Sequence, residues 1–460
     1  MGPRVGTVLV VLGLVSSLGA AAPRPNVVFF LADDLGRADC GFMGGNTIQT
    51  PHLDRLAAAG AKLDAFYVQP VCSPTRAALM TGRYPMRHGL QVGVVRPWAQ
   101  YGLPLVERTL PQALREAGYT TAIVGKWHLG HFAPEYLPTR RGFDRQYGHY
   151  NGQIDYFTHM RDGGFDWHRD DRACRDEGYS THLIAREAVR FVADQAGKKP
   201  FFLYVPFNAV HAPHQVPERY LKPYGALKGE RRKYAGMLAA MDEAVGQVVA
   251  AVEKAGVGKE TLFIFSSDNG GPQPGVVTDN GKFRAGKGTL YEGGVRVAAF
   301  ATWEGRIKPG STVTAPLHMV DWYPTLVKLT GAKEEQPLPV DGRDLWPTLT
   351  AGKPSPHETI LLNTTPTNGA IRAGDWKLIV HRDGDESGDG APRKKGARAS
   401  VELFHLGDDP YEKTNLATKH PERVKELRTK LAALAREAVP PRAAPRPAGY
   451  KTPKVWGERD

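Results

Sequence analysis

Cysteine is scarce in this sequence, with only 3 in 460 residues: Cys40, Cys72 and Cys174. An odd number of thiols cannot all pair within one chain, so at least one is unpaired or serves a chemical purpose. A bridge between Cys40 and Cys174 would leave Cys72 over, but the spacing does not establish that pairing. The sequence also lacks the H-E-x-x-H and C-x-x-C patterns of zinc sites, so zinc is not indicated.

Long apolar runs are also missing, except near the N-terminus. Residues 5–18 form an apolar run after the early Arg4, and small residues follow at Ala20–Ala22. This is the layout of a secretory signal peptide cleaved after Ala22, and the run is short for a membrane anchor. We expect no later stretch to be long and apolar enough to cross a bilayer. The sequence thus predicts a signal peptide over residues 1–22 and an exported protein, periplasmic or extracellular, without stable membrane association.

Negative charge is in deficit. The 60 Lys and Arg residues outnumber the 48 Asp and Glu residues, which gives a formal net charge of +12. Such a charge favours anionic partners, among them nucleic acid, anionic membranes and sulfated or phosphorylated ligands. No zinc-finger spacing or aromatic RNA-binding motif accompanies it, so we expect no nucleic-acid partner.

Four near-continuous apolar runs are present, and such runs are typical of strands buried on both faces of a parallel sheet. They span residues 26–34, 120–128, 201–211 and 261–271. Amphipathic helical patterns lie between them, at residues 51–63, 109–119 and 241–257. The alternation predicts an α/β domain over residues 23–350, with a mostly parallel sheet covered by helices on both faces.

The pattern changes after about residue 350. Shorter alternating segments and a closing amphipathic pattern predict a smaller C-terminal α+β subdomain over residues 351–438, with an antiparallel sheet and a helix. The segments are residues 370–381, 399–410 and 421–438. Residues 382–399 are a polar loop, and residues 439–460 are a Pro-rich basic tail to which we assign no structure.

Polar side chains follow each of the four predicted strands. They are Asp33 and Asp34, Lys126 and His128, His211, and Asp268 and Asn269. Any one of them could be an ordinary strand-end residue, such as a turn cap. In open α/β sheets, however, ligands bind beyond the carboxyl ends of the strands, and a coincidence at four strands makes the ordinary interpretation poor. We therefore predict that these residues form one site.

The predicted site has two complementary parts. Its acids and amide supply only oxygen, which suits a hard cation such as Ca²⁺ or Mg²⁺. Its cationic part could surround a tetrahedral oxyanion and consists of Arg76, Lys126, His128, His211 and Lys287. Lys287 lies in a Gly-flanked loop, where backbone approaches a ligand easily, although alone it would be an ordinary solvated lysine.

Cys72 lies beside this site in a chemically awkward position. Pro74 and Gly82 predict a short helix that begins next to Cys72, and the dipole at a helix N-terminus favours an acidic, nucleophilic thiolate. Thiolates suit soft metals, however, whereas the neighbouring acids indicate a hard one. The position calls for oxygen, but the sequence has sulfur.

A family resemblance explains the mismatch. The segment CSPTRAALMTGRYP, from Cys72, resembles the sulfatase signature C-x-P-x-R followed by T-G-R. Further blocks resemble the same family over nearly the whole mature chain: PNVVFFLADDLG, GKWHLG, NAVHAPHQVP, FSSDNGG, GKGTLYEGGVRVA and ELFHLGDDPYEKTNLA. Within the family, the blocks are similar to the arylsulfatase B-like group, which includes N-acetylgalactosamine-4-sulfatases.

The resemblance implies a fold, an activity and a modification. The fold is an alkaline-phosphatase-like α/β/α sandwich with a smaller C-terminal subdomain. The activity is hydrolysis of sulfate esters, of the arylsulfatase type, on a sulfated sugar or glycosaminoglycan. A formylglycine-generating or equivalent maturation enzyme would oxidise Cys72 to formylglycine (3-oxoalanine). One Ca²⁺ per chain would be held by Asp33, Asp34, Cys72 in its modified form, Asp268 and Asn269.

Catalytic roles follow from the same resemblance. The hydrate of the modified Cys72 would attack sulfur while Arg76 holds its oxygen and Lys126 bridges it to the sulfate. His211 and Lys287 would contact the sulfate, and one of them would protonate the leaving oxygen. His128 would take a proton from the second hydroxyl, so that the aldehyde reforms and sulfate is expelled.

Two other functions remain open from the sequence. One is a phosphoester or phosphonate hydrolase of the same superfold, and the other is a non-catalytic sulfoglycan-binding protein with unmodified Cys72. The aromatic and His-rich residues 147–171 are either a sugar-binding rim or ordinary packing, and His214 lines either the pocket or only its loop.

Overall fold

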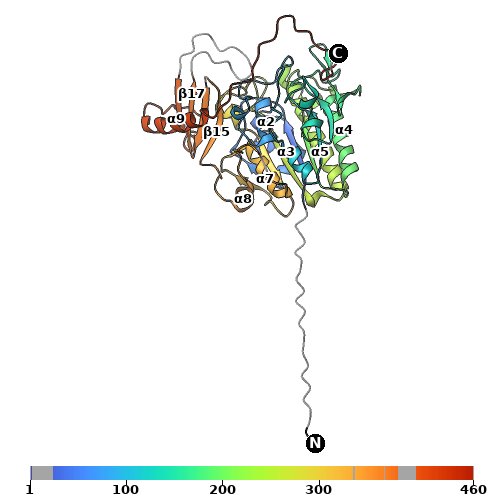
Figure 1. The fold of residues 1–460 in the computed structure, drawn as a ribbon, viewed down its shortest axis with the longest axis horizontal. Helices are drawn as coiled ribbons and strands as arrows, with labels where there is room; N and C mark the ends of the chain where they lie inside the picture. The colour runs from blue at the N-terminus through green and yellow to red at the C-terminus, as the bar shows by residue number, and fades with distance from the viewer. Residues whose placement is uncertain (1, 3–23, 335–336, 367, 382–399, 459–460) are drawn as a thin grey trace.

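The computed structural model describes residues 2, 24–334, 337–366, 368–381 and 400–458 (Figure 1). Apart from Gly2, the predicted signal peptide at residues 1–22 lies outside the described residues. The predicted polar loop at residues 382–399 does too.

The four predicted strands form the centre of a ten-stranded sheet. They are β11 (Thr261–Ser267), β1 (Asn26–Ala32), β10 (Phe201–Pro206) and β4 (Thr120–Lys126), which lie side by side in this order and run parallel. A fifth parallel strand, β5 (Arg145–His149), pairs with β4. Nearly every residue of the four strands is buried, which explains why their sequences are continuously apolar.

Short strands complete the sheet at both edges. Beyond β11 lie β12, β2 and β13, and beyond β5 lie β8 and β9; antiparallel pairs join each set to the parallel centre. Their bounds are Ala299–Thr302, Ala61–Leu63, Ser311–Val313, His168–Arg169 and Arg172–Ala173. The sheet is thus mixed overall and parallel where the polar strand ends lie.

Helices cover both faces of the sheet. One face packs against α1 (Pro51–Ala58), α4 (Ser180–Gln195) and α5 (Gly229–Lys254). The other packs against α2, α3, α7 and α8, which span Cys72–Thr81, Leu110–Glu116, Trp322–Thr330 and Trp346–Ala351. Strand β1 shows the alternation directly, because Val28 and Phe30 join the first core while Val27 and Phe29 join the second. The predicted α/β/α sandwich is confirmed (Figure 1).

Helix α5 corrects one expectation about apolar segments. By length and composition it is long and apolar enough to cross a membrane, although no later segment was expected to be. In its most apolar window, 72% of the residues are buried inside the protein, as in the core helix of a soluble domain. The helix is therefore only weak evidence for a membrane.

The C-terminal subdomain has the predicted antiparallel sheet and helix. Strands β15, β16, β17 and β18 form a four-stranded meander with bounds Thr359–Thr364, Asn368–Ala373, Trp376–His381 and Ser400–His405. Helix α9 (Pro421–Ala435) packs Leu427 and Leu431 onto it. The boundary at residue 350 between the two parts stays a prediction.

The basic tail after α9 has defined contacts with the α/β domain. Its backbone N–H groups at Val439 and Arg442 donate to the carbonyls of Met86 and Gly89. Further along, the indole of Trp456 is buried and donates to the carbonyl of Arg161 at 2.9 Å. The tail arches over the top of the molecule in Figure 1, at the end opposite the start of β1. The sequence of the tail does not predict this order, because the contacts are long-range and mostly made by backbone groups.

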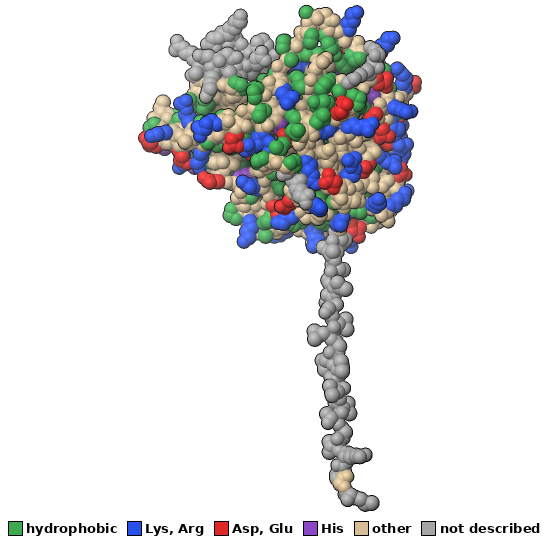
Figure 2. Space-filling view, viewed as in Figure 1, with side chains coloured by type: hydrophobic (Ala, Val, Ile, Leu, Met, Phe, Trp, Pro, Cys, Tyr) green, Lys and Arg blue, Asp and Glu red, His purple; other side chains and the backbone are tan. Residues whose placement is uncertain are grey.

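Basic side chains are not gathered into one patch on the face in Figure 2. Lys and Arg side chains are scattered over this face, several of them along its right-hand margin, and Asp and Glu side chains lie among them. The net charge of +12 therefore does not by itself mark a binding surface on this face.

Candidate active site

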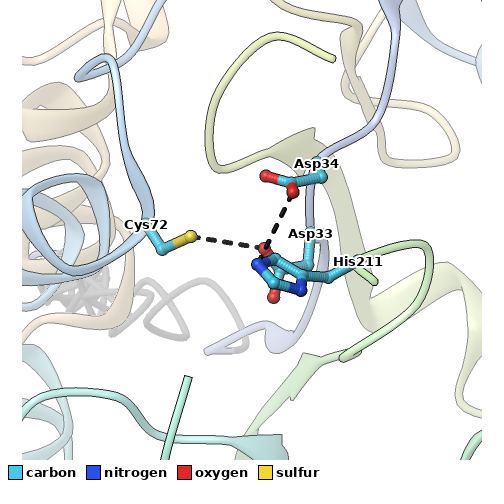
Figure 3. Close-up of side chains that lie close together, drawn as sticks. All are labelled: Asp33, Asp34, Cys72 and His211. Carbon is cyan, nitrogen blue, oxygen red and sulfur yellow. Dashed lines mark hydrogen bonds and ion pairs between the residues drawn. The ribbon is translucent and has the colours of Figure 1, made fainter. Parts of the chain in front are cut away.

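The first residue of α2 is Cys72, and its side chain points at the carboxylates that follow β1. The thiol is 1% exposed, and its Sγ lies 3.4 Å from Oδ1 of Asp33 (Figure 3). The helix ends where Gly82 adopts φ +68°, as the sequence predicts. Every residue of α2 is buried, so the helix holds Cys72 rigidly at the carboxyl end of the sheet.

Two neighbouring strands supply the acidic part of the site. Asp33 and Asp34 follow β1, and Asp268 and Asn269 follow β11. The backbone N–H of Asp34 donates to Oδ1 of Asp268 at 3.3 Å, and Nδ2 of Asn269 donates to Oδ1 of Asp34 at 2.8 Å. The four side chains are buried, and these hydrogen bonds cross directly between the two strand ends.

Each carboxylate of the site has its own cation, and each cation comes from a different element. Lys126, at the end of β4, pairs with Asp33. Arg76 of α2 pairs with Asp268, with Nη2 2.8 Å from Oδ2. Lys287 lies 2.7 Å from Oδ1 of Asp34. The charges of these three buried pairs cancel, and their side chains are held in fixed positions around Cys72.

His211 joins the same cluster after β10. Its Nε2 lies 3.6 Å from Oδ2 of Asp34, and Nδ1 lies 2.6 Å from the carbonyl of Ala212. The side chain is 18% exposed, more than that of Lys287 at 12%, so it lies on the solvent side of the cluster. Burial lowers the pKa of His211 to about 3, although Asp34 acts in the opposite direction.

His128 is held by backbone contacts rather than by an acid. Its Nε2 lies 3.0 Å from the carbonyl of Val95 and therefore donates to it, which leaves Nδ1 as the unprotonated nitrogen. Nδ1 is buried and has no hydrogen-bond partner among the described residues. The hydroxyl of Ser73 donates to the carbonyl of His128 at 2.9 Å and accepts from the N–H of Val95, which ties the histidine to the residue after Cys72.

The thiol itself is not the acidic thiolate expected from its place at a helix N-terminus. Burial raises the pKa of Cys72, and the carboxylates Asp268 and Asp33 raise it further. These effects outweigh the helix dipole, so Cys72 is a neutral thiol at physiological pH. Cys40 and Cys174 are also free, so the bridge that the sequence left open is not formed.

The carboxylate and amide oxygens of the cluster fit a hard divalent cation. Asp33, Asp34, Cys72 and His211 each offer one ligand atom, and these atoms all lie within 4.8 Å of one another (Figure 3). Oδ1 of Asn269 is buried and lacks a hydrogen-bond partner among the described residues, as expected for an oxygen reserved for a metal. Burial first and Asp33 second raise the pKa of Asp268 to about 6, because both disfavour its negative charge. A bound cation would stabilise that charge.

The structure brings all ten predicted site residues to one edge of the sheet; they come from six separate segments. Sequence reasoning missed the groups that support them. Tyr156 donates its hydroxyl to the carbonyl of His211, and Ser73 and Val95 seat His128. None of these contacts has a sequence motif of its own, because each uses a main-chain carbonyl.

The aromatic stretch at residues 147–171 mostly serves as packing. Tyr147, Tyr150 and Trp167 are buried, and Phe157 is the large apolar side chain exposed there, at 44%. His214 pairs with Glu230 at 2.8 Å. The ordinary interpretation of this stretch is therefore favoured over a sugar-binding rim.

Comparisons with known proteins agree with this geometry. A family model described as Sulfatase matches residues 25–332. The chain belongs to the sulfatase family. This sulfatase is 37% identical to arylsulfatase J of Mus musculus, over 95% of the chain and 81% of the relative. It is 34% identical to N-acetylgalactosamine-6-sulfatase of Mus musculus, over 89% of the chain and 85% of the relative.

A solved structure extends the similarity to three dimensions. The crystal structure of Ps i-CgsB in complex with k-i-k-neocarrahexaose superimposes on this sulfatase with a TM-score of 0.82 and 31% identity, covering 91% of the chain and 94% of that chain. The predicted family, its arylsulfatase-like relatives and the sulfuric ester hydrolase class are thus confirmed.

Proposed function

We propose that this sulfatase removes sulfate esters from a sulfated sugar, of the glycosaminoglycan or algal galactan type, with an oxygen nucleophile made from Cys72. The observation that carries the proposal is the setting of Cys72. Its buried thiol lies against Asp33 in a cluster of oxygen and nitrogen donors, where a neutral thiol has no evident use. The sugar substrate is supported by the names of the relatives, an N-acetylgalactosamine-6-sulfatase and a protein bound to neocarrahexaose.

The nucleophile would be formylglycine at position 72. A maturation enzyme, with an external two-electron oxidant, would oxidise the side-chain carbon of Cys72, so that the carbon–sulfur bond breaks, sulfur leaves as sulfide and the carbon takes up oxygen from water as an aldehyde, which a second water would hydrate. Asp33, Asp34, Asp268, Asn269 and the modified residue 72 would hold one Ca²⁺. When bound, this cation would stabilise the negative charge on the nucleophilic oxygen and on the sulfate.

The remaining side chains would orient the sulfate and move protons. One hydroxyl of the hydrate would attack sulfur, and the bond from sulfur to the sugar oxygen would break. His211 and Lys287, which both contact Asp34, would bind the sulfate, and one of them would give a proton to the leaving oxygen. Lys126 and Arg76 would fix the attacking oxygen.

His128 would complete the cycle as a base. Its Nδ1 is free to accept a proton, because Nε2 already donates to Val95. Removal of the proton from the second hydroxyl would let the carbonyl reform, and the bond between the side-chain carbon of residue 72 and the sulfated oxygen would break, so that sulfate leaves with that oxygen. Nδ1 could not accept a proton if a carboxylate held the ring in the tautomer that is protonated at Nδ1.

We also propose that the protein is exported, on the basis of the apolar run and small residues before Pro23. Sequencing of the N-terminus of secreted material would test this. A mature chain that starts after Ala22 would support it, and an intact N-terminus in the cytoplasm would contradict it.

Sulfate release tests the activity. The wild-type protein and its Cys72→Ala variant would be assayed on an aryl sulfate, a sulfated disaccharide and an aryl phosphate. We expect release of sulfate by the wild type only, with little or no phosphate. Full turnover by Cys72→Ala would show that the nucleophile lies elsewhere. Faster turnover of the phosphate than of the sulfates would assign the site to phosphoester hydrolysis instead.

A further inference from the structure

A cavity of about 590 Å³ lies beside the catalytic cluster, between the two parts of the chain. Its walls come from the segment after Asp34, from the loop before Lys287 and from the segment after β18 of the C-terminal subdomain. None of its lining residues belongs to the catalytic cluster. Those that matter here are Arg37, Lys282, Phe283, Arg296, Arg372 and Tyr411.

The cavity is close to the site of sulfate cleavage. Arg37 is three residues from the metal-site residue Asp34, so their Cα atoms can be at most about 11 Å apart. Lys282 is five residues from Lys287, which sets a limit of about 18 Å. Asn280 braces this loop, because its Nδ2 donates to the carbonyls of Gly271 and Ala285. A sugar chain of a few residues could therefore contact both places at once.

The inner wall of the cavity is positively charged and rigid. Four cations line it, Arg37, Lys282, Arg296 and Arg372, against the single carboxylate Asp64. Arg37 and Arg296 share Asp64, at 2.5 and 2.6 Å, and the two guanidinium groups lie 5.0 and 4.8 Å from the ring centre of Phe283 between them. Arg296 also contacts Glu292 at 3.4 Å, and Arg372 contacts Asp375 at 3.5 Å.

The rim of the cavity carries two lysines that are free to bind an anion. The Nζ atoms of Lys282 and Lys413 lie 5.9 and 5.5 Å from the ring centre of Tyr411, and both lysines are exposed. Neither forms an ion pair with another described residue. The ring of Tyr411 is half-buried and lies 5.9 Å from that of Phe283. An aromatic face flanked by two unpaired ammonium groups can pack against the apolar face of a sugar ring while the lysines contact its anionic groups.

We propose that this cavity is a second anion-binding subsite, which holds a sulfate or carboxylate on a neighbouring sugar of the same glycan chain. The proposal rests on the function proposed above. A sulfated oligosaccharide that reaches both sites should therefore bind more tightly than a disaccharide that reaches only the catalytic site. Lys282, Lys413 and Tyr411 should account for the difference in affinity.

Binding to an inactive protein tests the subsite without turnover. Each protein would carry Cys72→Ala, and calorimetry would measure its affinity for the disaccharide and hexasaccharide of chondroitin 6-sulfate, heparin and ι-carrageenan. The test pair is Lys282→Glu with Lys413→Glu. The control pair, Lys259→Glu with Lys308→Glu, makes the same change in net charge on exposed lysines near the start of β11 and the end of β12, at the opposite edge of the sheet.

We expect at least one hexasaccharide to bind at least tenfold more tightly than its disaccharide. The test pair should remove most of that gain, the control pair should keep it, and Tyr411→Ala should lose part of it. The subsite is contradicted if no hexasaccharide exceeds its disaccharide, or if the test and control pairs weaken binding equally. Because binding needs no catalysis, a failure of the sulfatase assay would refute the proposed function and leave this result interpretable.

Discussion

At the scale of single residues, Asn269 stands out because one end of its side-chain amide is hydrogen-bonded and the other is not. Its Nδ2 is used by Asp34 and by the carbonyl of Gly270, but its buried Oδ1 has no partner among the described residues. An unpartnered buried oxygen costs about 1–3 kcal/mol unless something else binds it. We assign that role to the proposed Ca²⁺.

The first prediction follows from this oxygen. Wild-type protein should unfold at a higher temperature in Ca²⁺ than in EDTA, because a ligand that binds only the folded state stabilises it, by about 2.7 kcal/mol at 100 times its Kd. Asn269→Ala should lose most of this shift, and Asn269→Asp should retain it, since a carboxylate also binds calcium. Calorimetric Tm values in the two buffers measure the effect. An unchanged shift in Asn269→Ala would remove Asn269 from the metal site.

Gly152 is a second residue whose identity matters, because no side chain fits at this position. A Cβ atom built on it would lie 2.3 Å from Cε1 of His128, far closer than atoms can approach. The imidazole ring of His128 therefore occupies the space that any side chain at position 152 would need.

Gly152→Ala should displace His128 and lower kcat by about 10²-fold, the usual minimum contribution of a proton-transfer group, with a smaller effect on KM. The matched control is Gly258→Ala, because a Cβ atom there has nothing within 4 Å. Steady-state kinetics on an aryl sulfate measure the difference. Equal kcat values for the two variants would argue against His128 as the base.

Among the elements, the C-terminal tail has an unexpected role as a clamp on the loop that seats His128. The carbonyl of Val95 accepts from His128, and two residues later the carbonyl of Pro97 accepts from Tyr450 at 3.3 Å. The indole of Trp98 in turn donates to the carbonyl of Ala444 at 3.1 Å. The loop is thus fixed between the active site on one side and the tail on the other.

Deletion of residues 440–460 should therefore lower kcat by about tenfold while the sheet and helices stay folded, because small displacements of a catalytic group are costly. The milder variant Trp456→Ala, which releases only the far end of the tail, should have a smaller effect. Circular dichroism and aryl-sulfate kinetics test this together. A truncated protein with wild-type kcat would show that the tail does not position His128.

The elements also show what sequence can and cannot predict. The four central strands and the polar residues after them could be predicted from the sequence, because strands buried on both faces have continuous apolar sequences that end abruptly. The edge strands β12, β2 and β13 have only three or four residues each, too few for a pattern. Helix α5 begins at Gly229, twelve residues before the predicted start, because its first turn is polar and residues 234–241 are continuously apolar, so neither part shows a helical period.

The site residues were predictable for a related reason. Cys72 and the strand-end acids, lysines and histidines carry chemistry in their side chains, so residue type and spacing identified them. The contacts that hold His128 and His211 were not predictable, because each ends on a main-chain carbonyl, which every residue possesses: His128 donates to the carbonyl of Val95, and the hydroxyl of Tyr156 donates to the carbonyl of His211.

For the whole molecule, a buried ion cluster joins the C-terminal subdomain to the catalytic domain. Lys377 of β17 has no exposed surface and lies 2.8 Å from both Glu292 and Glu412. Glu292 begins the short helix α6 (Glu292–Val295), a few residues after Lys287, which pairs with Asp34. The cluster therefore connects the subdomain to the loop that carries Lys287.

Lys377→Met should lower the free energy of unfolding by about 3–5 kcal/mol, because it leaves the buried Glu412 without its cation and Glu292 with Arg296 alone. Lys430→Met is the matched control, since its pairs with Glu358 and Glu426 are largely exposed and therefore contribute little to stability. Denaturant titration of both variants measures the difference. Equal destabilisation would show that the buried cluster contributes no more than a surface pair.

We propose above all that the side chain at position 72 works as an oxygen nucleophile and not as a thiol. Mass spectrometry of the peptide that contains residue 72, from protein that releases sulfate, tests this most directly. We expect the mass of 3-oxoalanine at position 72 in a fraction of molecules that rises in proportion to specific activity. An unmodified cysteine throughout a fully active preparation would contradict it.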